Sequence, residues 1–517
     1  MAVHLNREES VFRNELVFTP DAKAVNLENT LTNLFMQIRY DGNRVKSKVR
    51  SEHTLDSLFG YMCACERDGD MSGVAENKDA VEAWLRCNLA NLVFRGNLSK
   101  EKLSSLRPMH LEAFRIRNLK HTRDYFTADQ VYLMLKSRPE ILARLKEYLA
   151  RGFDPSTNFI TPGQQLDIDT VAILHLVKNV KMDVRSTTRL RQTTPFLKKQ
   201  AELFCDDVLR LLWYQDVVPK SVMTEYLRVL VGFHLALYAY RLIALLPKMT
   251  AEGSRDVADD WSLVVDASGR LDSPLEAVAC ADVERSINGL NDYFRAVFAF
   301  NVVQSKLQNT GHEDDVDYIL RELKERPADL LAYAKMRMDD VFRRFSEDEE
   351  EEASDLRRYI QYEKDDFERY VAILTRVKGP YQYKFYQKFL DNVSMKNTDS
   401  AFMSGGRSTK HARRGVLGAK LVELLVQLLV LKERVGEGGF ETRALSVSEL
   451  IRAIRDRYGL IIDGTHEDRF SKSDVQTQLA FRANVEAFKD KLRQIGFYTD
   501  LSDAGTLQKI RPRYNKA

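Results

Sequence analysis

The sequence predicts a mainly α-helical protein in which a multi-helix body is followed by a C-terminal winged-helix domain. Two observations favour helices: the 517 residues include only 12 prolines and 24 glycines, and apolar residues recur three or four positions apart. Near the C-terminus the predicted elements follow the order helix, strand, helix, helix and hairpin. We therefore expect three domains: helical domains over residues 1–160 and 165–395, and a basic linker plus winged helix over 404–517.

In the N-terminal region, apolar side chains share one face of a helix in three segments, 55–62, 81–93 and 131–149. Residues 151–167 are rich in turn formers and predict the first boundary. In the central region the same spacing predicts helices near 201–212, 282–308, 314–325, 328–345 and 354–377. Residues 250–274 predict a loop carrying one short strand over 261–265. The acidic run 346–352 predicts a solvated loop or the first turn of a helix, with a docking site for a basic partner as the alternative.

The most apolar stretch, residues 226–246, is interrupted by Arg228, His234 and Arg241. A membrane-spanning helix needs about 20 consecutive apolar residues, so this stretch predicts a core helix, ended by Pro247. The five cysteines are irregularly spaced, and the N-terminus lacks an apolar signal segment. We therefore expect a cytoplasmic protein without a membrane partner.

Positive charge is concentrated at the C-terminal end. Residues 404–517 hold 21 Lys and Arg against 14 Asp and Glu, an excess of seven, although the whole chain has a net charge of only +3. A basic segment of this kind indicates a polyanionic partner. The sequence therefore predicts that double-stranded DNA binds this end of the chain.

Capping residues define the first elements of the C-terminal domain. Residues 417–432 predict an apolar helix, and 440–445 predict a short strand. Ser446 and Glu449 have the spacing of a capping box that begins the next helix, and Gly459 is placed to end it.

The last predicted helix covers residues 475–495 and ends at Gly496. Two strand-like segments follow, joined by a turn at Ala504 and Gly505. The complete order is that of a winged helix, in which the third helix enters the major groove and the hairpin contacts the DNA backbone.

Cations and amides of this domain are the candidate DNA contacts. Lys and Arg neutralise phosphates, whereas amide and guanidinium groups can make paired hydrogen bonds to base edges. The linker, the third helix and the hairpin offer Arg407, Lys410, Arg413, Arg414, Gln476, Gln478, Arg482, Asn484, Lys489, Arg493, Lys509, Arg511 and Arg513. Winged helices also dock proteins, so a protein-only scaffold is the alternative.

The runs GAKLVELLVQLLVLKE and LSVSELIRAIRDRYGLIID carry a resemblance to a known group of proteins. Over about residues 400–517 the chain resembles helical accessory proteins of bacterial anti-phage defence islands, of the methylation-associated defence type. The resemblance implies a non-catalytic partner that acts beside an ATPase, nuclease or methyltransferase of the same system. Together with the basic winged helix, it predicts a non-catalytic DNA-binding or adaptor subunit with protein partners from that system. It carries over no catalytic residue.

One local pattern resembles a calcium loop of the EF-hand type. Asp68, Asp70, Ser72 and Gly73 occupy positions 1, 3, 5 and 6 of such a loop, and Asp79 occupies position 12. Position 12 ordinarily carries Glu, and no second loop pairs with this one. An acidic loop between two helices is the simpler interpretation, and we expect no metal and no cofactor.

The sequence gives little support for an enzyme. It has no phosphate-binding glycine loop and no nucleophile elbow, and its cysteines lack the spacing of a zinc site. The enzymatic alternative is a HEPN-like ribonuclease, which uses an Arg and a nearby His, here Arg115 and His121. Two solvated basic residues on a helix also explain that pair. His175 and His234 lie in apolar helical runs and are predicted to be hydrogen-bonded core histidines.

An aromatic stretch precedes the basic linker. Tyr381, Tyr383, Phe385, Tyr386 and Phe389 are interleaved with Lys384 and Lys388. Such a stretch can stack on the bases of a nucleic acid, or it can pack one helix against another. The sequence leaves both interpretations open.

Overall fold

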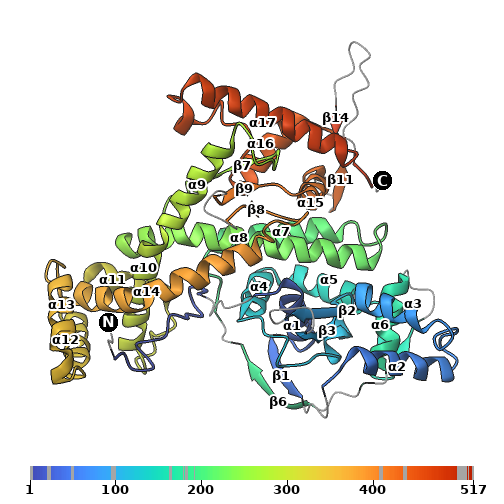
Figure 1. Ribbon diagram of the computed structural model, residues 1–517, viewed down its shortest axis with the longest axis horizontal. Helices are drawn as coiled ribbons and strands as arrows, with labels where there is room; N and C mark the ends of the chain where they lie inside the picture. Colours follow the sequence, from blue (N-terminus) through green and yellow to red (C-terminus); the bar gives the residue numbers. More distant parts are fainter. Residues whose placement is uncertain are drawn as a thin grey trace.

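The computed structural model describes residues 4–19, 25–47, 52–94, 100–161, 166–178, 180, 184–190, 193–406, 412–434, 439–497, 509–510 and 512–514. It confirms a mostly helical protein with small sheets. Three lobes surround the long central helix α8 (Lys220–Glu252): an N-terminal lobe, an arm built from α10–α14, and a C-terminal lobe (Figure 1). One hydrophobic core includes residues from Phe12 to Ile510, so the lobes share a continuous interior.

The N-terminal lobe contains α1 (Leu27–Arg39), β1 (Asn43–Ser47), α2 (Leu55–Arg67), α3 (Lys78–Trp84), β2 (Ala90–Phe94), β3 (Glu101–Leu106), α4 (Thr127–Lys136), α5 (Pro139–Ala150), β4 (Phe153–Asp154), β5 (Phe159–Ile160), α6 (Ile168–Lys178) and β6 (Val184–Arg189). The prediction of one helix over 81–93 is wrong, because a π-helical turn follows α3 and leads into β2, which pairs with β3. A short apolar run suits a strand as well as a helix. The segment 131–149 is two helices, since Pro139 begins α5.

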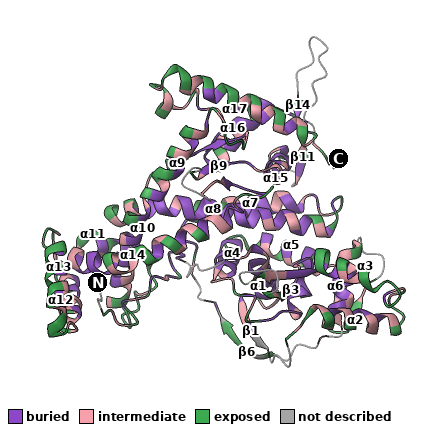
Figure 2. Ribbon diagram, viewed as in Figure 1, coloured by how far each residue is buried: buried purple, intermediate pink, exposed green. Residues whose placement is uncertain are grey.

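Helices α7 (Lys198–Leu212) and α8 form the centre of the molecule. Helix α8 is long and apolar enough to span a bilayer, but 94 % of its most apolar 18-residue window is buried inside the protein, as expected for a core helix. Figure 2 shows this burial along most of α8. The prediction that Pro247 ends the helix is wrong: α8 continues to Glu252, and Gly253, with φ of 69°, ends it. Proline removes one backbone hydrogen bond, and the packing of α8 against α7, α10, α11 and α14 outweighs that loss.

The arm contains α10 (Leu290–Lys306), α11 (Val316–Glu325), α12 (Ala328–Arg343), α13 (Glu350–Ile360) and α14 (Asp366–Val393). The predicted helix 282–308 is divided at Gly289, and the predicted helix 354–377 is divided between α13 and α14. Ser346 and Glu349 form a capping box, after which Glu350–Glu352 make the first turn of α13. The acidic run is therefore the start of a helix, one of its two predicted forms.

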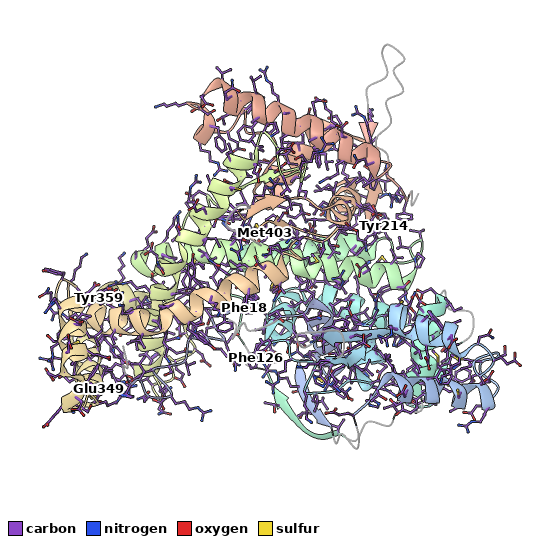
Figure 3. The ribbon with its side chains drawn as sticks, viewed as in Figure 1. Phe18, Phe126, Tyr214, Glu349, Tyr359 and Met403 are labelled. Carbon is purple, nitrogen blue, oxygen red and sulfur yellow. The ribbon has the colours of Figure 1, made fainter. Side chains whose placement is uncertain are left out.

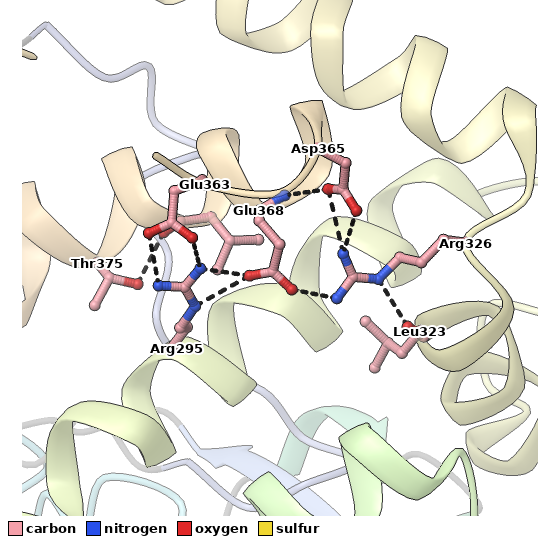
Figure 4. Close-up of polar contacts among 8 residues, drawn as sticks. Arg295, Leu323, Arg326, Glu363, Asp365, Glu368 and Thr375 are labelled. Atoms are coloured by element: carbon pink, nitrogen blue, oxygen red, sulfur yellow. Dashed lines mark hydrogen bonds and ion pairs between the residues drawn. The ribbon is translucent and has the colours of Figure 1, made fainter. Parts of the chain in front are cut away.

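Two arginines and three carboxylates brace the base of the arm (Figure 4). Arg295 on α10 donates to Glu363, with 2.6 Å between Nη2 and Oε2, and also contacts Glu368. Arg326, at the end of α11, donates to Asp365 at 3.0 Å and contacts the same Glu368. This network fixes the start of α14 against two neighbouring helices.

The C-terminal lobe contains β7 (Leu263–Asp266), α9 (Glu276–Asn288), β8 (Met403–Ser404), β9 (Arg414–Val416), α15 (Ala419–Leu429), β10 (Leu431–Glu433), β11 (Phe440–Thr442), β12 (Leu445–Ser446), α16 (Val447–Tyr458), β13 (Leu460–Ile461), α17 (Val475–Gln494) and β14 (Lys509–Ile510). Four strands form one sheet in the order β13–β7–β9–β8, with β7 parallel to both of its neighbours. Strand β7 comes from the central region of the chain, within the predicted loop. The boundary predicted between residues 395 and 404 therefore runs through a shared sheet.

The capping residues of α16 behave as predicted: Ser446 and Glu449 form a capping box, and Gly459 ends the helix with φ of 79°. Strand β12 pairs with β14, as the first and last strands of a winged helix do. However, residues 498–508, which hold most of the predicted hairpin, lie outside the described residues. Helix α17 packs its buried face on the four-stranded sheet. The winged helix therefore stays a prediction.

Candidate nucleic-acid interface

Helix α17, the predicted recognition helix, turns one face into the protein. Its buried residues are Ala480, Phe481, Asn484, Phe488 and Leu492. The Asn484 amide donates to the carbonyls of Val265 and Ile462 at 3.0 and 2.9 Å, and its oxygen accepts from the Ala267 amide at 2.8 Å. The prediction that Asn484 contacts a base is wrong, because this side chain joins α17 to β7 and β13.

On the outward face of α17, the cations lie beside carboxylates. Lys489 donates to Glu486 at 2.7 Å, and Arg493 pairs with Asp490. Gln478 is also engaged, since it donates to the Phe470 carbonyl and to the Ser473 hydroxyl. Arg482 is exposed, and it makes no ion pair with any residue that the structure describes. The face therefore has nearly balanced charge.

Of the predicted DNA contacts in the linker and hairpin, some are paired within the protein and others are exposed or lie outside the described residues. Arg407, Lys410 and Arg511 lie outside the described residues, and Lys509 is exposed on β14. Arg513 pairs with Glu423 and donates to the Ile495 carbonyl. Arg413 is held by both oxygens of Asp391, at 2.9 and 3.0 Å.

Arg414 on β9 is in the interior, with a side chain only 2 % exposed. Its guanidinium lies 3.4 Å from Asp266 and 2.9 Å from Glu276. The prediction that Arg414 contacts DNA is therefore wrong, because two carboxylates already surround it and the protein covers it.

The positive excess of residues 404–517 is thus largely matched inside the chain. Arg413, Arg414, Arg457 and Arg469 pair with carboxylates that precede residue 404. Those carboxylates are Asp206, Asp207, Asp266, Glu276, Asp282 and Asp391. The charge asymmetry along the sequence therefore joins the C-terminal lobe to the body and does not by itself indicate a polyanionic partner.

Lys491, on the inner side of α17, is a residue whose role the sequence does not suggest. Its ammonium donates to the Leu417 carbonyl at 2.5 Å. Burial lowers the pKa of Lys491 to about 8. The periodicity of α17 contains the only signal for this burial, since Lys491 is three residues from the buried Phe488.

A different helix carries exposed cations that are not balanced in this way. Helix α14 exposes Arg376, Lys384 and Lys388, which are spaced by multiples of four and form one row. None of the three makes an ion pair with a residue in the described ranges. Residues 369–390 contain five Lys and Arg and no Asp or Glu. We call this row, with the adjoining Tyr381 and Phe385, the α14 basic face.

The aromatic side chains of this stretch divide between the two predicted roles. Tyr386 and Phe389 are buried, and the Tyr386 hydroxyl donates to that of Tyr293 at 3.1 Å. Tyr381 is 46 % exposed, and its ring lies 4.5 Å from that of Phe385, between centroids. Lys388 lies over the Phe385 ring, and Arg376 lies over that of Tyr359, which Figure 3 places on the arm. Packing and an exposed aromatic surface therefore occur on opposite sides of one helix.

The family model of the methylation-associated defense system protein MAD7 matches residues 7–514. The chain belongs to this family. Among the curated proteins, none matches the chain. The resemblance noted at the C-terminus thus extends over nearly the whole chain, and the protein is a component of a methylation-associated anti-phage defence system.

The residues of the calcium-loop pattern do not converge on an open site. Asp70 pairs with the Lys178 ammonium. The Glu66 carboxylate accepts hydrogen bonds from the Val74 and Ala75 amides, at 2.8 and 3.0 Å, and so closes the loop. This geometry favours the acidic loop over a calcium site.

Within the described ranges, one group of potential metal ligands lies within 4.8 Å, namely Cys65, Asp70 and His175. Burial raises the pKa of the Cys65 thiol, which disfavours the thiolate that a metal requires. The Lys178 ammonium already supplies a positive charge to Asp70. These contacts favour a structural cluster.

Of the two residues of the ribonuclease alternative, Arg115 is covered and paired with a carboxylate. Arg115 has a side chain 9 % exposed and donates to Glu112 and Asn158, at 2.7 and 2.8 Å. The carbonyl of His121 accepts from Asn29 and Ser104. The Arg115 guanidinium is therefore neutralised and covered, which gives the nuclease alternative no support.

Of the two predicted core histidines, His234 is fully hydrogen-bonded. Its Nε2 lies 3.0 Å from Asp207, and its Nδ1 lies 2.9 Å from the Gln200 amide. Asp207 also accepts from Arg457 and Tyr458, so the network joins α7, α8 and α16. His175 differs, because its buried Nδ1 has no hydrogen bond and lies 3.9 Å from Asp70.

Proposed function

We propose that this protein is a non-catalytic DNA-binding subunit of its defence system and that it holds DNA on the α14 basic face. The observation that carries the proposal is the row of Arg376, Lys384 and Lys388, exposed together on a helix segment without a single carboxylate. Solvated charges on most protein surfaces are mixed in sign, as they are on α17. An unbalanced row attracts a polyanion.

The dimensions of the face suit a phosphate backbone. Twelve residues separate Arg376 from Lys388, which is about 18 Å along a helix. Each strand of a duplex has one phosphate for about every 3.4 Å of helix axis, so three cations over this length can neutralise phosphates of one strand. Tyr381 and Phe385 add rings that can contact sugars or unpaired bases.

The position of α14 also favours this role. The helix runs from the arm to the centre of the molecule, where it lies against α8 (Figure 1). The network of Arg295 and Arg326 fixes its first turn. A cation on a rigid helix loses little freedom when it meets a phosphate, which favours binding.

The test is the binding of a fluorescent 30-base-pair duplex by the full chain between 50 and 200 mM salt. Replacing Arg376, Lys384 and Lys388 by Gln should reduce the slope of log affinity against log salt by about 2.7, since each phosphate contact contributes about 0.9. The matched control is Arg67→Gln/Lys78→Gln/Arg86→Gln, which removes three exposed cations from the N-terminal lobe. An unchanged slope in the α14 variant would exclude this face.

The second candidate function is that of an adaptor that docks another protein through the arm. It is favoured by the exposed carboxylates of the 347–351 segment together with Tyr362, which is 88 % exposed, and Met336, which is 51 % exposed. Exposed acidic and apolar groups on one arm suit a basic protein surface. Glu347→Lys/Asp348→Lys/Glu351→Lys should then abolish co-purification of the other subunits and leave DNA binding unchanged.

A further inference from the structure

A cavity of about 350 Å³ lies between the start of α7, the C-terminal third of α8 and the segment 254–259. Its inner wall is apolar and is formed by Phe196, Leu245 and Met249, which are buried, and by the half-buried Val257. This size and this wall are typical of pockets for small organic ligands.

Two guanidiniums in the cavity have hydrogen-bond donors without acceptors. Arg241 donates from Nη1 to Gln200 at 2.6 Å, but its buried Nε has no hydrogen bond, and the nearest carboxylate, of Asp259, is 3.7 Å away. Arg255 donates to both oxygens of Asp317 from Nε and Nη2, at 2.8 and 2.6 Å, and its buried Nη1 has no hydrogen-bond acceptor. Buried donors of this kind are rare in folded proteins. Two of them line this cavity, where an oxygen of a ligand could accept from them.

The rim of the cavity adds further positive charge. Lys198 and Lys199 are exposed there and make no ion pair with any described residue. They begin α7, whose N-cap residue Leu197 provides no side-chain hydrogen bond to the first-turn amides. These lysines and guanidiniums together are suited to an anionic group.

The rim also carries carboxylates, at Asp256 and Asp259, and Asp259 lies 3.7 Å from Arg241. Carboxylates can accept hydrogen bonds from hydroxyl or amino groups, and they would repel a second anionic group. The cavity thus combines guanidinium and ammonium donors, an apolar wall and carboxylates that can accept hydrogen bonds.

We propose that this cavity binds a nucleoside monophosphate. The phosphate would meet the Arg241 and Arg255 donors and the two lysines, because guanidinium and phosphate are matched in geometry and charge. The base would lie on Leu245, Met249 and Val257, and the sugar hydroxyls would donate to the aspartates. The site is separate from the α14 basic face and does not depend on the proposal that the protein binds DNA.

The test is titration calorimetry of the full chain with AMP, GMP, CMP and UMP, with the matching nucleosides and inorganic phosphate as separate ligands. At least one monophosphate should saturate a single site, at least about tenfold more tightly than its nucleoside or phosphate alone, since each of those lacks half of the contacts. The proposal fails if no monophosphate binds. It also fails if inorganic phosphate or the nucleoside binds equally well.

Variants on the rim locate the site without disturbing the interior. Arg241 is left unchanged, because it also holds Gln200, which contacts the buried His234. Lys198→Glu/Lys199→Glu should weaken the monophosphate at least about tenfold, and Val257→Trp should weaken it by filling the cavity. The control Arg67→Glu/Lys78→Glu makes the same charge change in the N-terminal lobe, and binding equal to this control in both rim variants would overturn the assignment.

Discussion

Helices α14 and α17 are both long, amphipathic and rich in Lys and Arg, yet they use their cations differently. On α17, Glu486 lies three residues before Lys489 and Asp490 lies three residues before Arg493, and both ion pairs form. On α14, no carboxylate occurs between Arg369 and Leu390, so the exposed cations stay unbalanced. A cation on a helix is neutralised within the protein when a carboxylate lies one helical turn away, and it stays available to a ligand when none does.

The same contrast separates the C-terminal lobe from the rest of the chain. Its excess of positive charge meets carboxylates such as Asp207, Asp266 and Asp282 in the body. Charge counted along a segment predicts a surface only when the segment folds alone. Here β7 enters the sheet between β13 and β9, so the segment does not fold alone.

The largest effect on stability is expected at Arg414, the predicted DNA contact that is most deeply buried. Arg414→Met leaves Asp266 buried without its cation, which should cost about 3–5 kcal/mol of unfolding free energy. Arg482→Met, on the exposed face of α17, should change it by less than about 0.5 kcal/mol. Urea denaturation of the two variants measures the difference, and equal midpoints would contradict the burial of Arg414.

A smaller loss is expected at Asn484, whose side chain makes three hydrogen bonds to buried backbone. Asn484→Ala leaves those groups without partners and should cost about 2–3 kcal/mol. Gln476→Ala, on the exposed side of the same helix, is the control. If Asn484→Ala instead lowered DNA affinity at unchanged stability, α17 would be the recognition helix after all.

The pH dependence of stability should report the half-buried lysine of α17, Lys491. The pKa of Lys491 is about 8 in the folded chain against a usual value near 10.5, so the unfolded chain binds more protons between these values. Stability contributed by this group therefore rises as the pH increases from about 8 to 10.5. Lys491→Met should flatten this rise in the melting temperature, and a rise of unchanged steepness would show that Lys491 is not buried.

The smallest effect concerns the charge pairs of α17. Glu486→Gln/Asp490→Asn removes the carboxylate partners of Lys489 and Arg493, and stability should change by less than about 1 kcal/mol, since both carboxylates are exposed. If pairing is what keeps α17 from binding a polyanion, DNA affinity should rise a few-fold in the same variant. No rise in a duplex-binding assay would mean that pairing is not the reason.

Much of the fold follows from local patterns in the sequence. The capping box at Ser446 and Glu449, the glycine end at Gly459 and the strand before Asp266 all depend on neighbouring residues, and all are present. The same local reasoning predicts wrongly that α8 ends at Pro247, because tertiary packing stabilises the helix beyond that proline. Likewise, 90–94 is a strand because β3 is available to pair with it.

The candidate site is harder to predict from the sequence than the fold. Val265, which accepts a hydrogen bond from Asn484, lies more than 100 positions away in β7. The carboxylates that neutralise Arg414 are equally distant, in β7 and α9, so no local pattern indicates these contacts. The α14 basic face was visible as interleaved lysines and aromatics, but periodicity alone could not say which rings face outward. The absence of acids from residues 369–390 was the available signal.

The central claim is that DNA binds α14 and not α17, and charge reversal on each helix tests it most directly. Arg376→Glu/Lys384→Glu/Lys388→Glu and Arg482→Glu/Lys489→Glu/Arg493→Glu change the net charge equally, so long-range electrostatics cannot distinguish them. Duplex affinity at 100 mM salt should fall about 100-fold in the α14 variant and less than about fivefold in the α17 variant. The opposite order would contradict the account and restore α17 as the recognition helix.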